Sequence, residues 1–125
     1  MEEVQKIKLL RNGRRGYCQI KGENRTHISE DVMNAVIERD KKCVYCENEF
    51  GSTRGKMATW EHINGKTKDV EEWNITLCCG SCNSSRGNKE LKYWFKTAPR
   101  GKTINKENLP KVIKDYIDKY EKIID

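Results

Sequence analysis

The sequence contains little apolar material and no long apolar run. Of its 125 residues, 35% are hydrophobic and 35% are charged. No stretch approaches the roughly 20 apolar residues that a membrane-spanning helix requires, so we expect no membrane partner. The first residues, Met1–Lys6, are polar and acidic, unlike the apolar core of a secretory signal peptide. We therefore expect a cytoplasmic protein with reduced thiols.

The scarcity of apolar residues also argues against a large hydrophobic core. A chain of 125 residues is long enough for one domain and too short for two ordinary ones. Small domains with weak cores often depend on a metal or a disulfide for stability. The chain has six cysteines that could serve either purpose. Because disulfides are rare in the cytoplasm, paired cysteines there favour a metal site.

Two Cys-x-x-Cys motifs carry that signal. A tetrahedral Zn²⁺ takes four ligands, and two such motifs supply two each from compact turns. Four thiolates leave no open position for water, so this zinc would hold the fold and would not catalyse a reaction. Cys78, next to the second motif, is expected to be a buried free thiol. The predicted structural zinc ligands are Cys43, Cys46, Cys79 and Cys82.

The net charge is +6, with basic clusters at 11–15, 41–42 and 86–89. A basic excess suits a polyanionic partner, and nucleic acid is the commonest one. A solvated surface would carry the same charges, so the charge pattern leaves both interpretations open.

Local patterns predict a mixture of helices and strands. The predicted elements are a helix capped by Ser29 and ending near Asp40, strands at 57–62 and 75–78, a helix from Asn83 onward through Phe95, a linker at 97–106, and a final helix capped by Asn108. The Asn64-Gly65 dipeptide predicts a turn after the first strand.

The order of motifs resembles the HNH endonuclease family. The resemblance covers roughly residues 30–96, and its parts agree in order, spacing and residue type. Glu61 stands where the family more often has Asp, and Gly65 where it often has Pro. The matching segments are Cys43-x-x-Cys46, Glu61-His62, Asn74-Ile75-Thr76-Leu77, and Cys79-x-x-Cys82-Asn83 with the residues up to Lys89.

The resemblance implies a ββα-metal core and a catalytic site. His62 matches the general base that activates the attacking water, a role that suits a neutral imidazole. Glu61 and Asn83 match ligands of one catalytic divalent cation, and oxygen ligands fit Mg²⁺ or Mn²⁺. Asn74 matches the residue that fixes the loop orienting the base. The implied activity is hydrolysis of phosphodiester bonds, leaving 3′-hydroxyl and 5′-phosphate ends.

The implied substrate is DNA, most simply double-stranded. Arg14, Arg15, Arg86 and Lys89 are the expected contacts to its backbone. One small domain cuts one strand, so double-strand cleavage would need a homodimer or a second encounter. Restriction, homing and phage DNA metabolism all use such nucleases, in bacterial or phage-infected cytoplasm.

The resulting expectation is a small α+β fold. Its ββα-metal, treble-clef-like core at 29–97 would be stabilised by a zinc ion bound to four cysteines, and helices would flank this core. Residues 1–28 would form an N-terminal extension that could be a β-hairpin, and residues 98–125 a linker and the C-terminal helix.

Simpler interpretations of the same residues stay open. The chain could be a non-catalytic zinc-stabilised nucleic-acid-binding module, or a protein-interaction module stapled by zinc. His62 could be a structural histidine, Glu61 a plain surface charge, and Asn83 only a helix N-cap. Asn74 could merely begin a strand. The joint presence of all four residues favours the nuclease.

Overall fold

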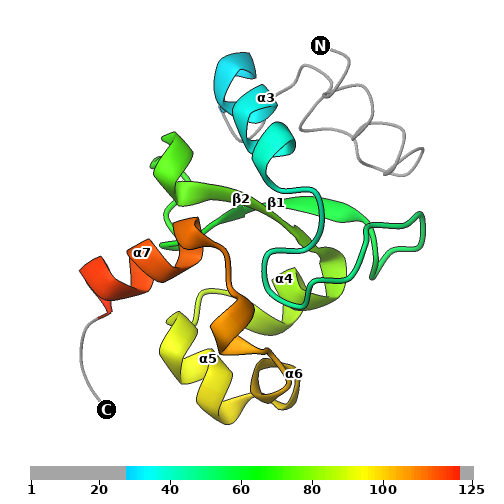
Figure 1. Cartoon of the computed structure of the whole chain (residues 1–125), viewed down its shortest axis with the longest axis vertical. Coiled ribbons are helices and arrows are strands. Elements are labelled where there is room, and N and C mark those ends of the chain that lie inside the picture. Colours follow the sequence, from blue (N-terminus) through cyan, green and yellow to red (C-terminus); the bar gives the residue numbers. More distant parts are fainter. Residues whose placement is uncertain (1–27, 122–125) are drawn as a thin grey trace.

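The computed structural model describes residues 28–121 and shows a small α+β fold built on a two-stranded antiparallel sheet (Figure 1). In the described part of the chain, none of the helices combines the length and apolar character needed to cross a membrane. The expected N-terminal hairpin, Arg14 and Arg15 fall outside the described residues. The elements are α3 (Glu30–Arg39), β1 (Ala58–His62), η1 (Glu72–Asn74), β2 (Ile75–Cys79), α4 (Gly80–Arg86), α5 (Leu91–Thr97), α6 (Pro99–Lys102), η2 (Lys106–Asn108) and α7 (Lys111–Tyr120).

Helix α3 begins and ends where the sequence predicts. The side-chain oxygen of Ser29 accepts a hydrogen bond from the backbone N–H of Val32 at 3.2 Å, which satisfies a donor of the first turn. Asp40 follows the last helical residue, and its carboxylate accepts hydrogen bonds from Arg39 and from the backbone N–H of Leu77. Arg39 and Asp40 therefore tie the end of α3 to strand β2.

The hairpin of β1 and β2 separates two small apolar clusters. The register pairs Ala58 with Cys79 and His62 with Ile75, so alternate side chains point to opposite faces. In Figure 1, α3 lies on one side of the hairpin and helices α4 to α6 lie on the other. The cluster on the α3 side contains Ile28, Met33, Val36, Ile37, Ala58, Trp60, Ile75 and Leu77. Neither cluster is large, in line with the low apolar content.

The helix expected from Asn83 onward is two helices. Helix α4 already begins at Gly80, so Asn83 lies inside it, and the interpretation of Asn83 as an N-cap is wrong. The helix ends because Gly87 has φ +56° and ψ −128°, a conformation that residues with a Cβ rarely adopt. Helix α5 then starts at Leu91 in a new direction and buries Trp94 and Phe95.

The segment expected to be a linker also contains helical structure. The short helix α6 packs tightly on α5, because Gly101 lies against the backbone carbonyl of Trp94 with no space for a Cβ. The final helix, α7, begins after Pro110 rather than at Asn108, which ends η2. At the other end of α7, the carboxylate of Glu121 accepts hydrogen bonds from the first backbone N–H groups of α5. Both ends of the C-terminal region are thus fixed to the core.

Candidate functional site

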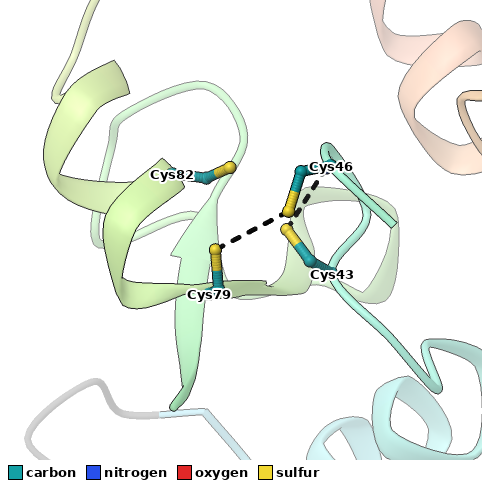
Figure 2. A group of neighbouring side chains, drawn as sticks. All are labelled: Cys43, Cys46, Cys79 and Cys82. Carbon is teal, nitrogen blue, oxygen red and sulfur yellow. Dashed lines mark hydrogen bonds between the residues drawn. The ribbon is translucent and has the colours of Figure 1, made fainter. Parts of the chain in front are cut away.

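The two Cys-x-x-Cys motifs converge on one point, as Figure 2 shows. The first motif forms a tight turn, in which the backbone N–H groups of Tyr45 and Cys46 point to the sulfur of Cys43 at 3.4 and 3.5 Å. The second motif lies where β2 passes directly into α4, with Cys79 ending the strand and Cys82 in the first turn of the helix. The turn of the first motif and the β2–α4 junction of the second therefore face each other, and each supplies two sulfurs.

The four sulfurs have the spacing of a tetrahedral metal site. All lie within 4.8 Å of one another, and those of Cys46 and Cys79 are 3.8 Å apart. A tetrahedron with Zn–S bonds of about 2.3 Å has edges of about 3.8 Å. The cysteines are buried or half-buried, and four thiolates would leave no open coordination position, as in structural zinc sites. The residues are positioned to hold a metal ion, and the all-thiolate donor set is consistent with structural zinc.

Cys78 does not belong to this cluster. Its side chain is fully buried beside Thr59, and burial raises the pKa of its thiol well above the usual value. The expectation of a buried free thiol at Cys78 is confirmed.

Asn74 fixes the loop that follows β1. Its side-chain oxygen accepts the backbone N–H of Asn64 at 2.9 Å, and its amide donates to the side chain of Asn64 and to the backbone carbonyl of Asp69. The side chain of Asn64 in turn donates to the Asp69 carboxylate at 2.6 Å. Since Asn74 is fully buried, these bonds are shielded from water and hold the loop in one conformation.

His62 stands at the end of β1, next to that loop. Its ring is half-buried, and Nε2 is enclosed without a hydrogen-bond partner. Burial lowers the pKa of His62, because the charged imidazolium loses solvation, and the carboxylate of Asp69 partly opposes this. The lowered pKa favours the neutral imidazole near pH 7.

Glu61 is buried in a polar network on the face of the hairpin that α4 covers. One carboxylate oxygen, Oε2, accepts the Tyr45 hydroxyl at 2.7 Å and the Arg86 guanidinium at 2.8 Å. Burial raises the pKa of Glu61, while Arg86 and Tyr45 act in the opposite direction. The interpretation of Glu61 as a plain surface charge is wrong.

Asn83 reaches from α4 to the same strand. Its amide donates to the Thr59 hydroxyl at 2.9 Å and to the backbone carbonyl of Trp60 at 3.3 Å. Within residues 28–121, neither Asn83 Oδ1 nor Glu61 Oε1 has a hydrogen-bond partner, and neither atom is enclosed. Each of these two residues thus keeps one oxygen available to a ligand.

Arg86 does not lie on the surface. Its side chain is 2% exposed, with Nη1 on Glu61 and Nε donating to the backbone carbonyl of Lys89 at 2.6 Å. The expectation that Arg86 contacts the DNA backbone is corrected by this placement, because a buried and ion-paired guanidinium cannot reach a phosphate. Lys89 is exposed, and its ammonium donates to the backbone carbonyl of Ser85.

Glu61 and Asn83 both take part in the packing of α4 on β1, Glu61 through Arg86 and Asn83 through Thr59. His62 and Asn74 lie at the end of the hairpin that the 63–74 loop closes, and the His62 side chain is on the opposite face of the strand from Glu61. Sequence reasoning missed Tyr45, which lies inside the first Cys-x-x-Cys motif, and Asn64, the partner of Asn74. No sequence signal pointed to Tyr45, whereas the Asn64-Gly65 turn marked the loop without showing its partner.

Comparisons with family models, with curated proteins and with solved structures find no match to this chain. The likeness to HNH endonucleases therefore depends on the motif residues alone.

Proposed function

We propose that this protein is a metal-dependent endonuclease of the HNH type, which hydrolyses phosphodiester bonds of DNA. The observation that carries the proposal is that Glu61 and Asn83 each keep one unengaged oxygen on the α4 side of β1. His62, with its lowered pKa, follows Glu61 at the end of the same strand, next to the loop that Asn74 fixes. A binding module would not require this set of four residues.

In this proposal His62 takes the proton from the attacking water. Its lowered pKa keeps the imidazole unprotonated at neutral pH, which a general base requires. Asn74 positions His62 indirectly, by holding the loop that starts at Ile63.

Glu61 and Asn83 would hold the catalytic cation through Oε1 and Oδ1. Oxygen ligands of this kind fit Mg²⁺ or Mn²⁺, with waters and a phosphate oxygen filling the remaining positions. Such a cation, when bound, stabilises negative charge on the phosphate and on the leaving oxygen. Arg86 and Tyr45 contribute by holding the Glu61 carboxylate in a single orientation.

The proposed partner is double-stranded DNA. Lys41, Lys42 and Lys89 are exposed, and they can contact phosphates without reading sequence. Zinc is the proposed occupant of the four-cysteine site. It would fix the position of α4, and hence of Asn83.

The test is incubation of supercoiled plasmid with wild-type protein and with His62→Ala, each with Mg²⁺, with Mn²⁺ and with EDTA. We expect nicked product from the wild type with either cation only, and none from the variant at unchanged fold and zinc content. Cleavage by His62→Ala at the wild-type rate would overturn the assignment of the base. Linear product would indicate that two copies act together.

A zinc-stabilised nucleic-acid-binding module is the second candidate, and one observation favours it. Glu61 Oε2 and the Asn83 amide are already engaged within the protein, so both side chains also make sense as structural groups. This candidate predicts DNA binding that is independent of Mg²⁺, with no strand breaks from the wild type.

A further inference from the structure

A guanidinium lies against the sulfurs of the second Cys-x-x-Cys motif. Arg100, in α6, directs Nε to the sulfur of Cys82 at 3.2 Å and Nη2 toward the sulfur of Cys79 at 3.9 Å. Within residues 28–121, Arg100 forms no ion pair with a carboxylate. The two sulfurs are therefore the groups that accept hydrogen bonds from the charged guanidinium.

The backbone around Arg100 is held from both sides. On one side, Gly101 lies directly on the carbonyl of Trp94, and the N–H of Lys102 bonds to the carbonyl of Ala98 at 2.9 Å. On the other side, the Thr103 hydroxyl donates to the Arg100 carbonyl at 2.7 Å. The packing of α5 and α6 thus fixes the backbone position from which the Arg100 side chain reaches the sulfurs.

Metal loading fixes the charge of the sulfurs that Arg100 contacts. A cysteine thiol is a weak hydrogen-bond acceptor, whereas zinc is bound by the thiolate. When a divalent ion binds, all four cysteines are thiolates and the centre carries a formal charge of about −2. Hydrogen bonds from a cation to charged acceptors are about twice as strong as neutral ones. The contact made by Arg100 is accordingly stronger in the loaded protein.

We propose that Arg100 is an outer-sphere partner of the four-cysteine metal centre, which raises its metal affinity and couples metal loading to the docking of α6. The coupling is reciprocal, as thermodynamic linkage demands. The free energy by which metal binding favours the docked α6 equals the free energy by which the docked α6 favours metal binding. The proposal concerns the metal centre only, and it holds whether or not the protein cuts DNA.

The first measurement is metal affinity, by competition of Zn²⁺ between the protein and a chromophoric chelator. Arg100→Gln removes the charge and keeps a donor, and we expect the affinity to fall 10- to 100-fold, the usual effect of removing an outer-shell partner. The affinity of Arg100→Lys should fall less, because the charge is kept. Lys102→Gln, on the same helix but exposed, is the matched control and should equal the wild type. Wild-type affinity in Arg100→Gln, or an equal loss in Lys102→Gln, overturns the proposal.

The second measurement is hydrogen exchange at the backbone N–H of Ile104, which bonds to the carbonyl of Gly101 at the end of α6. We expect zinc to slow this exchange in the wild type and to slow it much less in Arg100→Gln. Should Arg100→Gln fail to fold, the same comparison is made with Arg100→Lys, where a smaller effect of zinc than in the wild type is expected. An equal effect of zinc in wild type and variant rejects the coupling.

Discussion

Arg86 and Glu61 form a 2.8 Å ion pair between α4 and β1, and their side chains are only 2% and 5% exposed. The pair joins the helix that carries Cys82 and Asn83 to the strand that carries His62. Both charges have lost their solvation, so each depends on the other, and on the Tyr45 hydroxyl, for compensation.

Replacing Arg86 by Met should destabilise the protein by about 3–5 kcal/mol, the usual cost of leaving one buried charge unpaired. Urea denaturation of the metal-loaded protein measures this. Lys89→Met, three residues along the chain and exposed, should change stability by less than about 0.5 kcal/mol. Adding Glu61→Gln to Arg86→Met should recover part of the loss; no recovery would show that packing, not charge, dominates.

His62 should make stability depend on pH. Its pKa in the folded state lies below the ordinary 6.5, so the unfolded chain binds more protons between the two values. The contribution of His62 is therefore fully present above pH 6.5 and is lost as the pH falls through the lower, folded-state pKa. Denaturant titrations from pH 7.5 to 5 should show this slope in the wild type and a flatter one in His62→Gln.

The only other histidine, His27, supplies the control, because His27→Gln should retain the slope. If the protein cleaves DNA, the acid limb of its rate profile should lie below pH 6.5 for the same reason. An acid limb above pH 6.5 would contradict the neutral imidazole.

Asn74→Asp should disorder the loop after β1 while keeping the shape of the side chain. A carboxylate cannot donate to Asn64 or to the carbonyl of Asp69, so two hydrogen bonds are lost and the Asp69 carbonyl is left without its partner. We expect a loss of about 2–4 kcal/mol in stability and strongly reduced cleavage, with metal content unchanged. Full cleavage activity in Asn74→Asp would show that the loop conformation held by Asn74 is not needed for cleavage.

Removal of the metal should unfold much of the domain. We expect one zinc per chain in the wild type, and a cooperative loss of near-ultraviolet circular dichroism when a strong chelator is added. Cys82→Ser should lower the zinc content and the melting temperature sharply. Cys78→Ala should keep one zinc, because Cys78 lies outside the four-sulfur cluster. Equal zinc loss in both variants would argue against the assigned ligands.

Gly87→Ala tests the break between α4 and α5. The space around Gly87 is open, so an added methyl group meets no neighbour, and any cost comes from the backbone at φ +56°. We expect a destabilisation of about 1–3 kcal/mol. Gly51→Ala, where φ is not in the positive range, should cost less. Equal stability of Gly87→Ala and wild type would mean that the turn between the helices can rearrange.

Local signals in the sequence predicted local structure well. The Ser29 cap, the two strands and the two cysteine motifs each depend on a few neighbouring residues, and the structure has all of them. The break at Gly87 was missed because the apolar spacing of Leu91, Trp94 and Phe95 suits a continuing helix equally well.

The contacts between distant segments could not be predicted. Arg86 is 25 residues from Glu61, and a lone arginine in a basic cluster gives no sign that it is buried. Tyr45 is 16 residues from Glu61, and its position inside a metal-binding turn has no required residue type. These pairings arise from how α4 packs on the hairpin, which is a property of the whole fold.

The direct passage of β2 into α4, without any loop, limits how the length of this segment can vary. Consecutive residues of a helix are about 100° apart around its axis. One residue inserted between Cys82 and Asn83 would leave the sulfur in place and turn Asn83 and Arg86 away from β1. Length changes in 79–86 should therefore be far less tolerated than in the exposed 66–68 segment, so homologues of this protein should differ in loop length there while keeping the span from Cys79 to Arg86 constant.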